Sequence, residues 1–326
     1  MIGYHASHEQ FDPAHLLALA ARAAAAGFGG LSGSDHFHPW TPAQGQSGHA
    51  WSWAGAVLAS VPLSLGLVTC PFGRYHPAVI AQAAATLARM YPERFWLAVG
   101  SGEALNEHVT GEPWPDKPAR NARLHASAEA MRRLWRGERV DCDGEIRIRE
   151  ARLYTLPPRP PLLLGAALGA ETARWLGGWA DGLITVSAPL PKLREIVAAF
   201  REGGGIGKPM FLQVKLCYAA TDAQARAEAL AQWRANLAPP AIAADLVRPE
   251  DFAALADRLD PAGIEQAVNI SSDPLRHAEW LSTYRELGFE RLYLHNVGRQ
   301  QEAFIDVFGA QVLPSLAGAW SRRYQP

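Results

Sequence analysis

Apolar and polar positions alternate along the chain in blocks that predict strands and helices in turn. Short runs of continuous apolar residues indicate strands buried on both faces, and the longer stretches between them, with one apolar face, indicate helices. The predicted strands are Ile2–Ala6, Gly30–Ser34, Leu63–Thr69, Arg94–Val99, Leu162–Ala166, Gly182–Val186, Phe211–Tyr218, Ala267–Ile270 and Arg291–His295. The predicted helices are Asp12–Gly27, Pro77–Met90, Lys117–Trp135, Ala170–Trp179, Lys192–Arg201, Thr221–Asn236, Asp273–Leu287 and one after Gln300.

Eight or nine strands with helices between them fit a (β/α)8 TIM barrel better than a doubly wound sheet. No Gly-x-Gly-x-x-Gly follows the first strand, where a dinucleotide-binding sheet carries one. The 326 residues are therefore predicted to form one barrel domain over 1–326, a length that α/β barrels commonly hold. Two segments depart from the repeat. An excursion is expected over about 138–160, where Asp143-Gly144 indicates a hairpin, and an irregular or helical insertion over about 237–266.

Composition narrows the classes of function. The 31 basic and 32 acidic side chains leave a formal net charge of −1, so the chain has no basic surplus for nucleic acid. No apolar run reaches the length of a membrane span. The 3 cysteines lie far apart, without the paired spacing of a zinc or redox site. Because the chain also begins without a signal-peptide pattern, a cytoplasmic location is expected.

Candidate chemistry lies at the carboxyl ends of the predicted strands, where a barrel enzyme builds its active site. These positions hold His5, Ser7, Glu9, Ser34, Asp35, His36, His38, Trp40, Thr69, Cys70, Arg74, Tyr75, Glu103, Asn106, Glu107, His295 and Asn296. Each has a structural alternative: a loop histidine can be solvated, a tryptophan can pack the loop, and Glu103 can cap the helix that begins near Ala104. Arg74 can serve as a structural ion-pair partner.

Four segments in order resemble a known family: Gly3-Tyr4-His5-Ala6-Ser7, Ser34-Asp35-His36-Phe37-His38-Pro39-Trp40, Arg74 to Gln82, and Gly100 to Glu107. They are similar to the luciferase-like superfamily of flavin- and deazaflavin-dependent oxidoreductases. Within it they resemble the branch of glucose-6-phosphate dehydrogenases that use the deazaflavin coenzyme F420. The chain looks like the subset of that branch that is taken to use FMN.

The resemblance implies catalytic roles for three residues. The histidine matching His36 is the base that takes the proton of an alcohol as hydride leaves for the ring of the cofactor. Imidazole suits this role because its ordinary pKa lies near neutral pH. Trp40 matches an indole that stabilises the reacting centre, and Glu103 matches a carboxylate that protonates or polarises the reduced cofactor.

The resemblance also implies a set of cofactor contacts. Asp35 and Asn106 match residues of the cofactor region. Ala167, Leu168 and Gly169 match a loop that holds the cofactor phosphate on amides at a helix N-terminus. Leu67 and Val68 match a bulge of the third strand, often with a cis peptide bond, that lies behind the ring.

Two positions depart from the glucose-6-phosphate dehydrogenases, which hold the sugar phosphate with cationic side chains. Glu195 and Gln266 stand where two lysines are expected, although Lys192 or Arg194 could reach the same place. Because such a clamp rests on charge-assisted hydrogen bonds, we expect that glucose 6-phosphate is not the substrate. The 11 tryptophans, several of them near His36, favour a neutral and partly apolar or aromatic substrate.

Four hypotheses follow. The first is an FMN-dependent oxidoreductase that acts on an unknown small organic substrate. Its reaction can be that of a monooxygenase acting on paired donors. The alternative is F420-dependent hydride transfer of the alcohol or sugar dehydrogenase type. A remote alternative is a metal-dependent hydrolase in which Asp35, His36 and His38 act with His295 and Asp181. A flavin-binding protein without catalysis is the fourth. The resemblance further implies a homodimer, for which the apolar helices after the second and third strands are candidate interface material.

Overall fold

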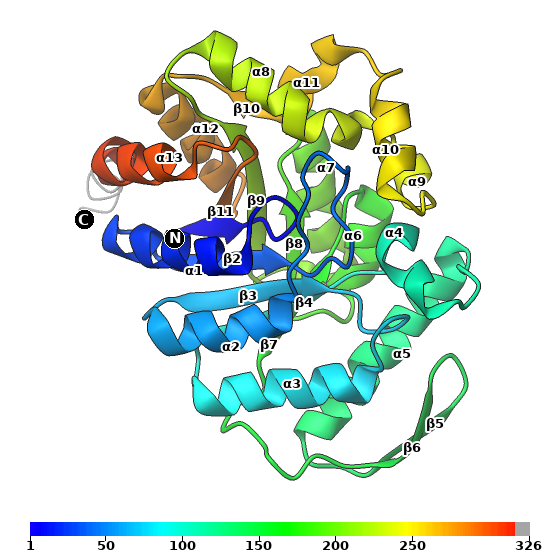
Figure 1. Cartoon of the computed structure of the whole chain (residues 1–326). Helices are drawn as coiled ribbons and strands as arrows, with labels where there is room; N and C mark the ends of the chain where they lie inside the picture. Colours follow the sequence, from blue (N-terminus) through cyan, green and yellow to red (C-terminus); the bar gives the residue numbers. More distant parts are fainter. Residues whose placement is uncertain (317–326) are drawn as a thin grey trace.

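Eight parallel strands close into a barrel in the computed structural model, which describes residues 1–316 (Figure 1). Around the barrel the order is β1, β2, β3, β4, β7, β8, β9 and β11, and β11 pairs with β1 to close it. The strands are β1 (Ile2–Ala6), β2 (Gly30–Ser34), β3 (Ser64–Thr69), β4 (Phe95–Val99), β7 (Leu162–Ala166), β8 (Gly182–Val186), β9 (Met210–Cys217) and β11 (Arg291–Asn296). The predicted (β/α)8 fold is therefore confirmed.

Helices connect the strands and form the outer layer. They are α1 (Pro13–Ala25), α2 (Ala50–Ser60), α3 (Pro77–Met90), α4 (Ala104–Glu107), α5 (Lys117–Trp135), α6 (Ala170–Gly177), α7 (Leu190–Phe200), α8 (Asp222–Trp233), α12 (Pro274–Glu286) and α13 (Gln301–Val307). Local sequence explains several starts: Asp12 accepts a hydrogen bond from the amide of Ala14 at 2.8 Å, and proline occupies the first turn of α1. This is the expected N-cap followed by a proline whose missing N–H costs nothing.

Two segments leave the barrel repeat. Between α5 and β7 the chain forms an antiparallel hairpin of β5 (Val140–Asp143) and β6 (Arg147–Ala151), which extends away from the barrel (Figure 1). After α8 it forms the short helices α9 (Pro240–Ala243), α10 (Pro249–Ala256) and α11 (Ile264–Ala267). The predicted strand over 267–270 shrinks to β10 (Asn269–Ile270), which pairs only with β9 outside the closed barrel.

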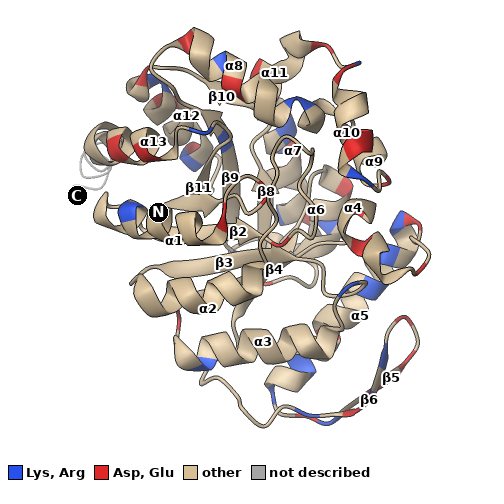
Figure 2. Cartoon of the chain, in the orientation of Figure 1, with Lys and Arg blue, Asp and Glu red and all other residues tan. Residues whose placement is uncertain are grey.

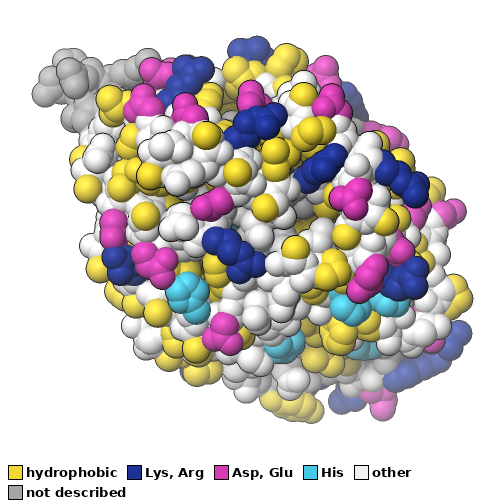
Figure 3. Space-filling model, turned by 45° about the horizontal axis from the view of Figure 1, so that its top comes forward, with side chains coloured by type: hydrophobic (Ala, Val, Ile, Leu, Met, Phe, Trp, Pro, Cys, Tyr) yellow, Lys and Arg dark blue, Asp and Glu magenta, His cyan; other side chains and the backbone are white. Residues whose placement is uncertain are grey.

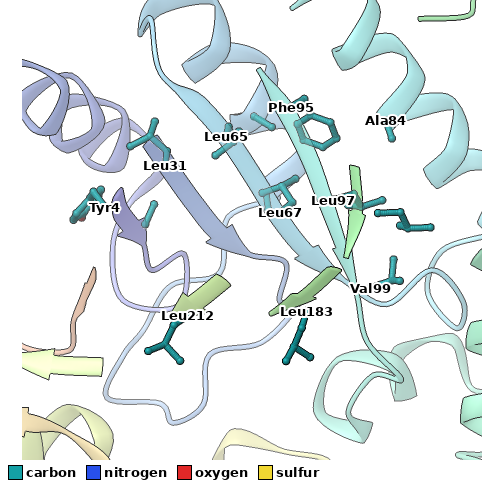
Figure 4. Packing of buried hydrophobic residues seen from close by; sticks show 14 of the residues in the cluster. Tyr4, Leu31, Leu65, Leu67, Ala84, Phe95, Leu97, Val99, Leu183 and Leu212 are labelled. Atoms are coloured by element: carbon teal, nitrogen blue, oxygen red, sulfur yellow. The ribbon is translucent and has the colours of Figure 1, made fainter. Parts of the chain in front are cut away.

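Apolar side chains pack in two layers, one on each side of the strands. The larger layer lies between strands and helices and includes Leu31, Leu183 and Leu212 (Figure 4). The second fills the barrel interior, where the ring of Trp96 lies 5.1 Å from that of Phe211 and 5.3 Å from that of Tyr293. This aromatic layer closes the barrel below its carboxyl-terminal mouth. Above this layer lies the end at which β/α barrels carry their sites.

Strand β3 lacks the bulge that the resemblance implied at Leu67 and Val68. Its residues pair with β2 and β4 in unbroken register, including Leu67 and Val68, so the structure has no bulge there. The described peptide bonds contain no cis bond either. Gly66 of β3 has a different role, because a methyl group at this position would overlap the indole of Trp96. The interior aromatic layer thus depends on a glycine in the neighbouring strand.

Charged side chains are unevenly distributed over the helices. Helix α2 carries none and α3 carries only Arg89, so both are almost entirely tan in Figure 2. Val79 and Met90 of α3 are more than half exposed. These uncharged outer faces are compatible with the homodimer, which stays a prediction. No helix within residues 1–316 is long and apolar enough to cross a bilayer.

Candidate active site

A cavity of about 360 Å³ lies at the carboxyl-terminal ends of the barrel strands. This volume falls within the range of small-molecule sites. Its polar lining consists of Glu9, Ser34, His36, Glu103, Thr185, Ser187, Lys192, Gln213, Lys215, Asn236, Gln266 and His295. Its remaining lining is mostly apolar and includes Trp40, Val68, Leu168, Val186, Ile196, Trp233 and Phe252. The site thus draws on strands from all around the barrel and on the segment after α8.

His36 is paired with a buried carboxylate. Its Nε2 lies 3.5 Å from Oε1 of Glu9, whose side chain is only 2% exposed. Glu9 also accepts hydrogen bonds from Ser7 at 3.0 Å and Ser34 at 2.6 Å. Burial alone raises the pKa of Glu9, but the charge of His36 and the Ser34 hydrogen bond outweigh it, and the pKa lies below its ordinary value. Glu9 is therefore held as a carboxylate that stabilises a positive charge on His36.

Trp40 closes one side of this pair. Its ring centroid lies 4.9 Å from that of His36, and its other neighbour is the ring of Phe252 from α10, at 5.3 Å. The loop that follows β2 therefore packs against the segment after α8. The indole thus packs the loop and also lines the cavity, and its catalytic role stays a prediction.

Glu103 faces the cavity rather than the helix that follows it. Its side chain makes no capping hydrogen bond to α4, although it stands at the N-cap position. Burial raises the pKa of Glu103, and the negative charge of Glu9 adds to this, against the opposing charges of His36 and Lys215. The capping alternative is thus excluded, and Glu103 is a carboxyl group poised to hold a proton beside the cavity.

Asp35 points away from the cavity, into a network of four donors. Its carboxylate accepts hydrogen bonds from Trp51 at 3.1 Å, Thr69 at 2.7 Å and Tyr75 at 3.2 Å. It also forms an ion pair with Arg74 at 3.2 Å, with both side chains buried. The expected structural role of Arg74 is confirmed. Asp35 anchors the start of the loop that carries His36, and a direct contact with a cofactor stays a prediction.

Some of the other predicted cofactor residues line the cavity, and others are buried outside it. Val68 and Leu168 line the cavity, whereas Leu67 is fully buried in the outer apolar layer. Asn106 is buried, and its Oδ1 accepts hydrogen bonds from the amides of Phe37 at 2.9 Å and His38 at 3.4 Å. Asn106, which lies in α4 after β4, therefore fixes the shape of the His36 loop after β2.

Ala167 and Gly169 shape the entrance to α6. The amide of Ala167 donates to the carbonyl of Ile184 at 3.1 Å, which ties this loop to β8. Gly169 stands at the N-cap of α6, where no side chain caps the helix and the space around its Cα is open. The first amides of α6 are thus free of side-chain acceptors.

Sequence reasoning overlooked two lining residues on β9. Gln213 and Lys215 interrupt an apolar strand at alternate positions, and alternate residues share a face. Phe211, two residues earlier, belongs to the interior layer of the barrel, so Gln213 and Lys215 also face inward, above it. Two polar residues at this spacing in a buried strand were a signal that could have found them.

His295 lines the cavity but has no free ring nitrogen. Nε2 donates to Oε1 of Gln10 at 3.2 Å, and Nδ1 accepts from Nε2 of Gln213 at 3.2 Å. Burial lowers the pKa of His295 well below its usual value. In contrast, Nδ1 of His36 is buried without a partner. Of these two histidines, His36 is the one available to exchange a proton.

Two further predictions concern a metal site and a cationic clamp for a phosphate group. No group of three or more His, Cys, Asp or Glu side chains within residues 1–316 is placed to hold a metal ion, so the ligand set of the metal-hydrolase alternative is not brought together. Glu195 is exposed and does not line the cavity, whereas Gln266 and Lys192 do. Arg194 is not among the lining residues.

A comparison with known protein families identifies the family of this chain. The family model of luciferase-like monooxygenases matches residues 2–291, nearly the whole chain. The chain belongs to this family. The resemblance inferred from its strand-end motifs is therefore confirmed, and the chain is an oxidoreductase of the luciferase-like class.

Several relatives carry the same name. The chain is 39% identical to the F420-dependent glucose-6-phosphate dehydrogenase of Nakamurella multipartita, with 96% of each chain aligned. It is 36% identical to the protein of the same name from Beutenbergia cavernae, with 97% of each aligned. Among solved structures, an F420-dependent secondary alcohol dehydrogenase in complex with an F420–acetone adduct superposes with a TM-score of 0.91 and 31% identity, covering 97% of this chain and 98% of the other.

Proposed function

We propose that the chain is an F420-dependent dehydrogenase that transfers hydride between the coenzyme and the hydroxyl-bearing carbon of a small organic substrate. The observation that carries this proposal is the pairing of His36 with the buried carboxylate of Glu9, in one cavity with Trp40 and Glu103. The names of the relatives support the coenzyme. They favour F420 over FMN, which the sequence analysis placed first, and a dehydrogenase over a monooxygenase.

The residues present are compatible with a deazaflavin. Val68 and Leu168 offer apolar surface in the cavity for a flat ring, and Nδ1 of His36 is a buried polar atom that still lacks a partner. The uncapped amides at the start of α6 suit a phosphate group, because the N-terminus of a helix attracts anions. On the face shown in Figure 3, Lys and Arg side chains are interspersed with Asp and Glu, without one large basic patch.

The protein's own groups supply proton transfer. A bound deazaflavin accepts or returns a hydride. His36 takes the proton of the substrate hydroxyl, and the Glu9 carboxylate stabilises the imidazolium that results. The hydrogen bonds from Ser7 and Ser34 keep that carboxylate in place. Glu103, whose pKa burial raises, can hold or give a proton within the same cavity.

The coenzyme is tested by titrating the purified protein with F420 and with FMN, following ligand fluorescence. We expect F420 to bind more tightly and to be reduced when an alcohol is added. Tight binding of FMN alone, with oxygen consumption in the presence of a reductase, would favour the monooxygenase hypothesis instead.

The base is tested by His36→Asn, with His38→Asn as the matched control. His38 lies two residues away, but its Nδ1 donates to the carbonyl of Leu105 and it does not line the cavity. Removing a general base lowers the rate by about 10²–10⁴-fold, so His36→Asn should lose most hydride transfer while F420 binding persists. An unchanged rate in this variant would remove His36 from the role of base.

The exclusion of glucose 6-phosphate stays a prediction. Gln266 lines the cavity where a lysine was expected, which weakens a phosphate clamp, but Lys192 and Lys215 line it as well. We therefore propose comparing glucose 6-phosphate with neutral secondary alcohols as substrates of the F420-loaded protein. Faster turnover of the neutral alcohols would support the prediction.

A further inference from the structure

Lys215 is a cation within the cavity that the proposed proton transfer does not use. It lies in the carboxyl-terminal half of β9, opposite His295 of β11 in the strand register. Among the described residues its ammonium group has no hydrogen-bond or ion-pair partner. The titratable groups that interact with its charge are Glu103, Lys192, His5 and His295. The nearest aromatic face is that of Trp233, whose centroid lies 5.5 Å from Nζ.

We propose that Lys215 is a carbonyl-reactive amine that forms an imine with aldehydes and ketones entering the cavity. Two features of the surroundings favour this reaction. The amine faces a cavity that admits a small molecule, and it is flanked by a second cation, Lys192. Desolvation and a neighbouring cation are the two devices that turn lysines into nucleophiles in enzymes.

The state of the amine agrees with this geometry. Burial lowers the pKa of Lys215 to about 8, with Lys192 adding to the effect and Glu103 opposing it. At neutral pH this increases the fraction of free amine by roughly 300-fold over an ordinary lysine. A nucleophilic nitrogen is thus present where an ordinary lysine would be almost entirely protonated.

The reaction balances without an oxidant. The lone pair of Nζ attacks the carbonyl carbon, the two protons that Nζ loses are transferred to the carbonyl oxygen, which leaves as water, and a carbon–nitrogen double bond remains. Glu103 is a carboxyl group near enough to influence Lys215 and holds a proton more readily than usual, so it can supply one to the departing oxygen. The inference does not depend on the proposed coenzyme, because the amine and the cavity belong to the chain itself.

The chain offers a clear experiment because it contains only four lysines, Lys117, Lys192, Lys208 and Lys215. The purified full-length protein, without added coenzyme, is incubated with propanal and sodium cyanoborohydride, which reduces an imine to a stable secondary amine. Peptide mass spectrometry then gives a rate of labelling for each lysine. Lys192 is the matched control, since it lines the same cavity but is exposed.

At pH 7 we expect Lys215 to be labelled at least about tenfold faster than Lys192. The ratio of the two rates should fall as the pH rises above 8, because Lys215 is then largely free amine and gains little more. In Lys215→Met the label on this peptide should disappear while the labels on the other lysines remain. Equal rates at pH 7 for Lys215 and Lys192 would overturn the proposal, whether or not the protein transfers hydride to F420.

Discussion

Replacing Lys215 by methionine should stabilise the protein at neutral pH and remove a pH dependence of its stability. Methionine retains the length and apolar stem of lysine without the ammonium group. In the folded protein the charged form of Lys215 is disfavoured, since burial lowers its pKa from 10.5 to about 8. In the unfolded chain the ammonium group is hydrated and has its ordinary pKa.

The size of the effect follows from the pKa difference. At 1.36 kcal/mol per pKa unit, lowering the pKa from 10.5 to about 8 costs the folded protein about 3.4 kcal/mol below pH 8, where both states are charged. Between pH 8 and 10.5 the folded protein loses the proton while the unfolded chain still holds it, so stability rises with pH. The wild-type protein should therefore recover about 2.5 kcal/mol relative to Lys215→Met between pH 7 and pH 10.

Urea unfolding of the coenzyme-free protein, followed by tryptophan fluorescence, measures this difference. Both proteins are unfolded at several pH values from 7 to 10, and the difference between their free energies of unfolding is plotted against pH. Titrating groups that do not interact with Lys215 are shared by the two proteins and cancel in the difference. A difference that does not change with pH would refute the reasoning, because Lys215 would then have the same pKa in both states.

Two further pairs of variants test the framework of the site. Gly66→Ala should destabilise the protein by about 1–3 kcal/mol, because its methyl group overlaps the indole of Trp96. In α2, the methyl group of Gly55→Ala meets no neighbouring atom, so this variant should stabilise the protein by about 0.5–1 kcal/mol in the same urea experiment. Asp35→Ala should cost about 3–5 kcal/mol, because it leaves the donors of Trp51, Thr69 and Tyr75 without their acceptor and Arg74 with only Glu107, at 3.6 Å, as an ion-pair partner. Asp306→Ala breaks an exposed ion pair and should leave the unfolding midpoint nearly unchanged. An equal loss of stability in Asp35→Ala and Asp306→Ala would contradict the importance of burial.

The sequence determined the barrel and the end at which its chemistry lies. Continuous apolar runs and amphipathic stretches are local patterns, and their alternation leaves few arrangements in which every strand is covered on both sides. The residues that follow the strands, among them His36, Trp40 and Glu103, were therefore placed at one mouth before any contact was known. Strand limits were predicted within a residue or two, except at β10, where the predicted strand over 267–270 is only Asn269–Ile270.

Tertiary structure decided which strand-end residues face the cavity. Asp35 and His36 are neighbours in sequence, yet one meets Arg74 and Thr69 while the other meets Glu9. These partners come from other loops and strands, and only closure of the barrel brings them together. No local pattern along the chain carries that information.

The charge state of the site depends on the same closure. Glu103 follows β4 and Lys215 lies on β9, far apart in the sequence, and each titrates away from its ordinary pKa because packing removes water around it. Burial is a property of the assembled barrel, so residue type alone did not reveal that this lysine would face the cavity. The sequence thus determined which groups the mouth could contain, and packing decided which of them are dry, paired or free to react.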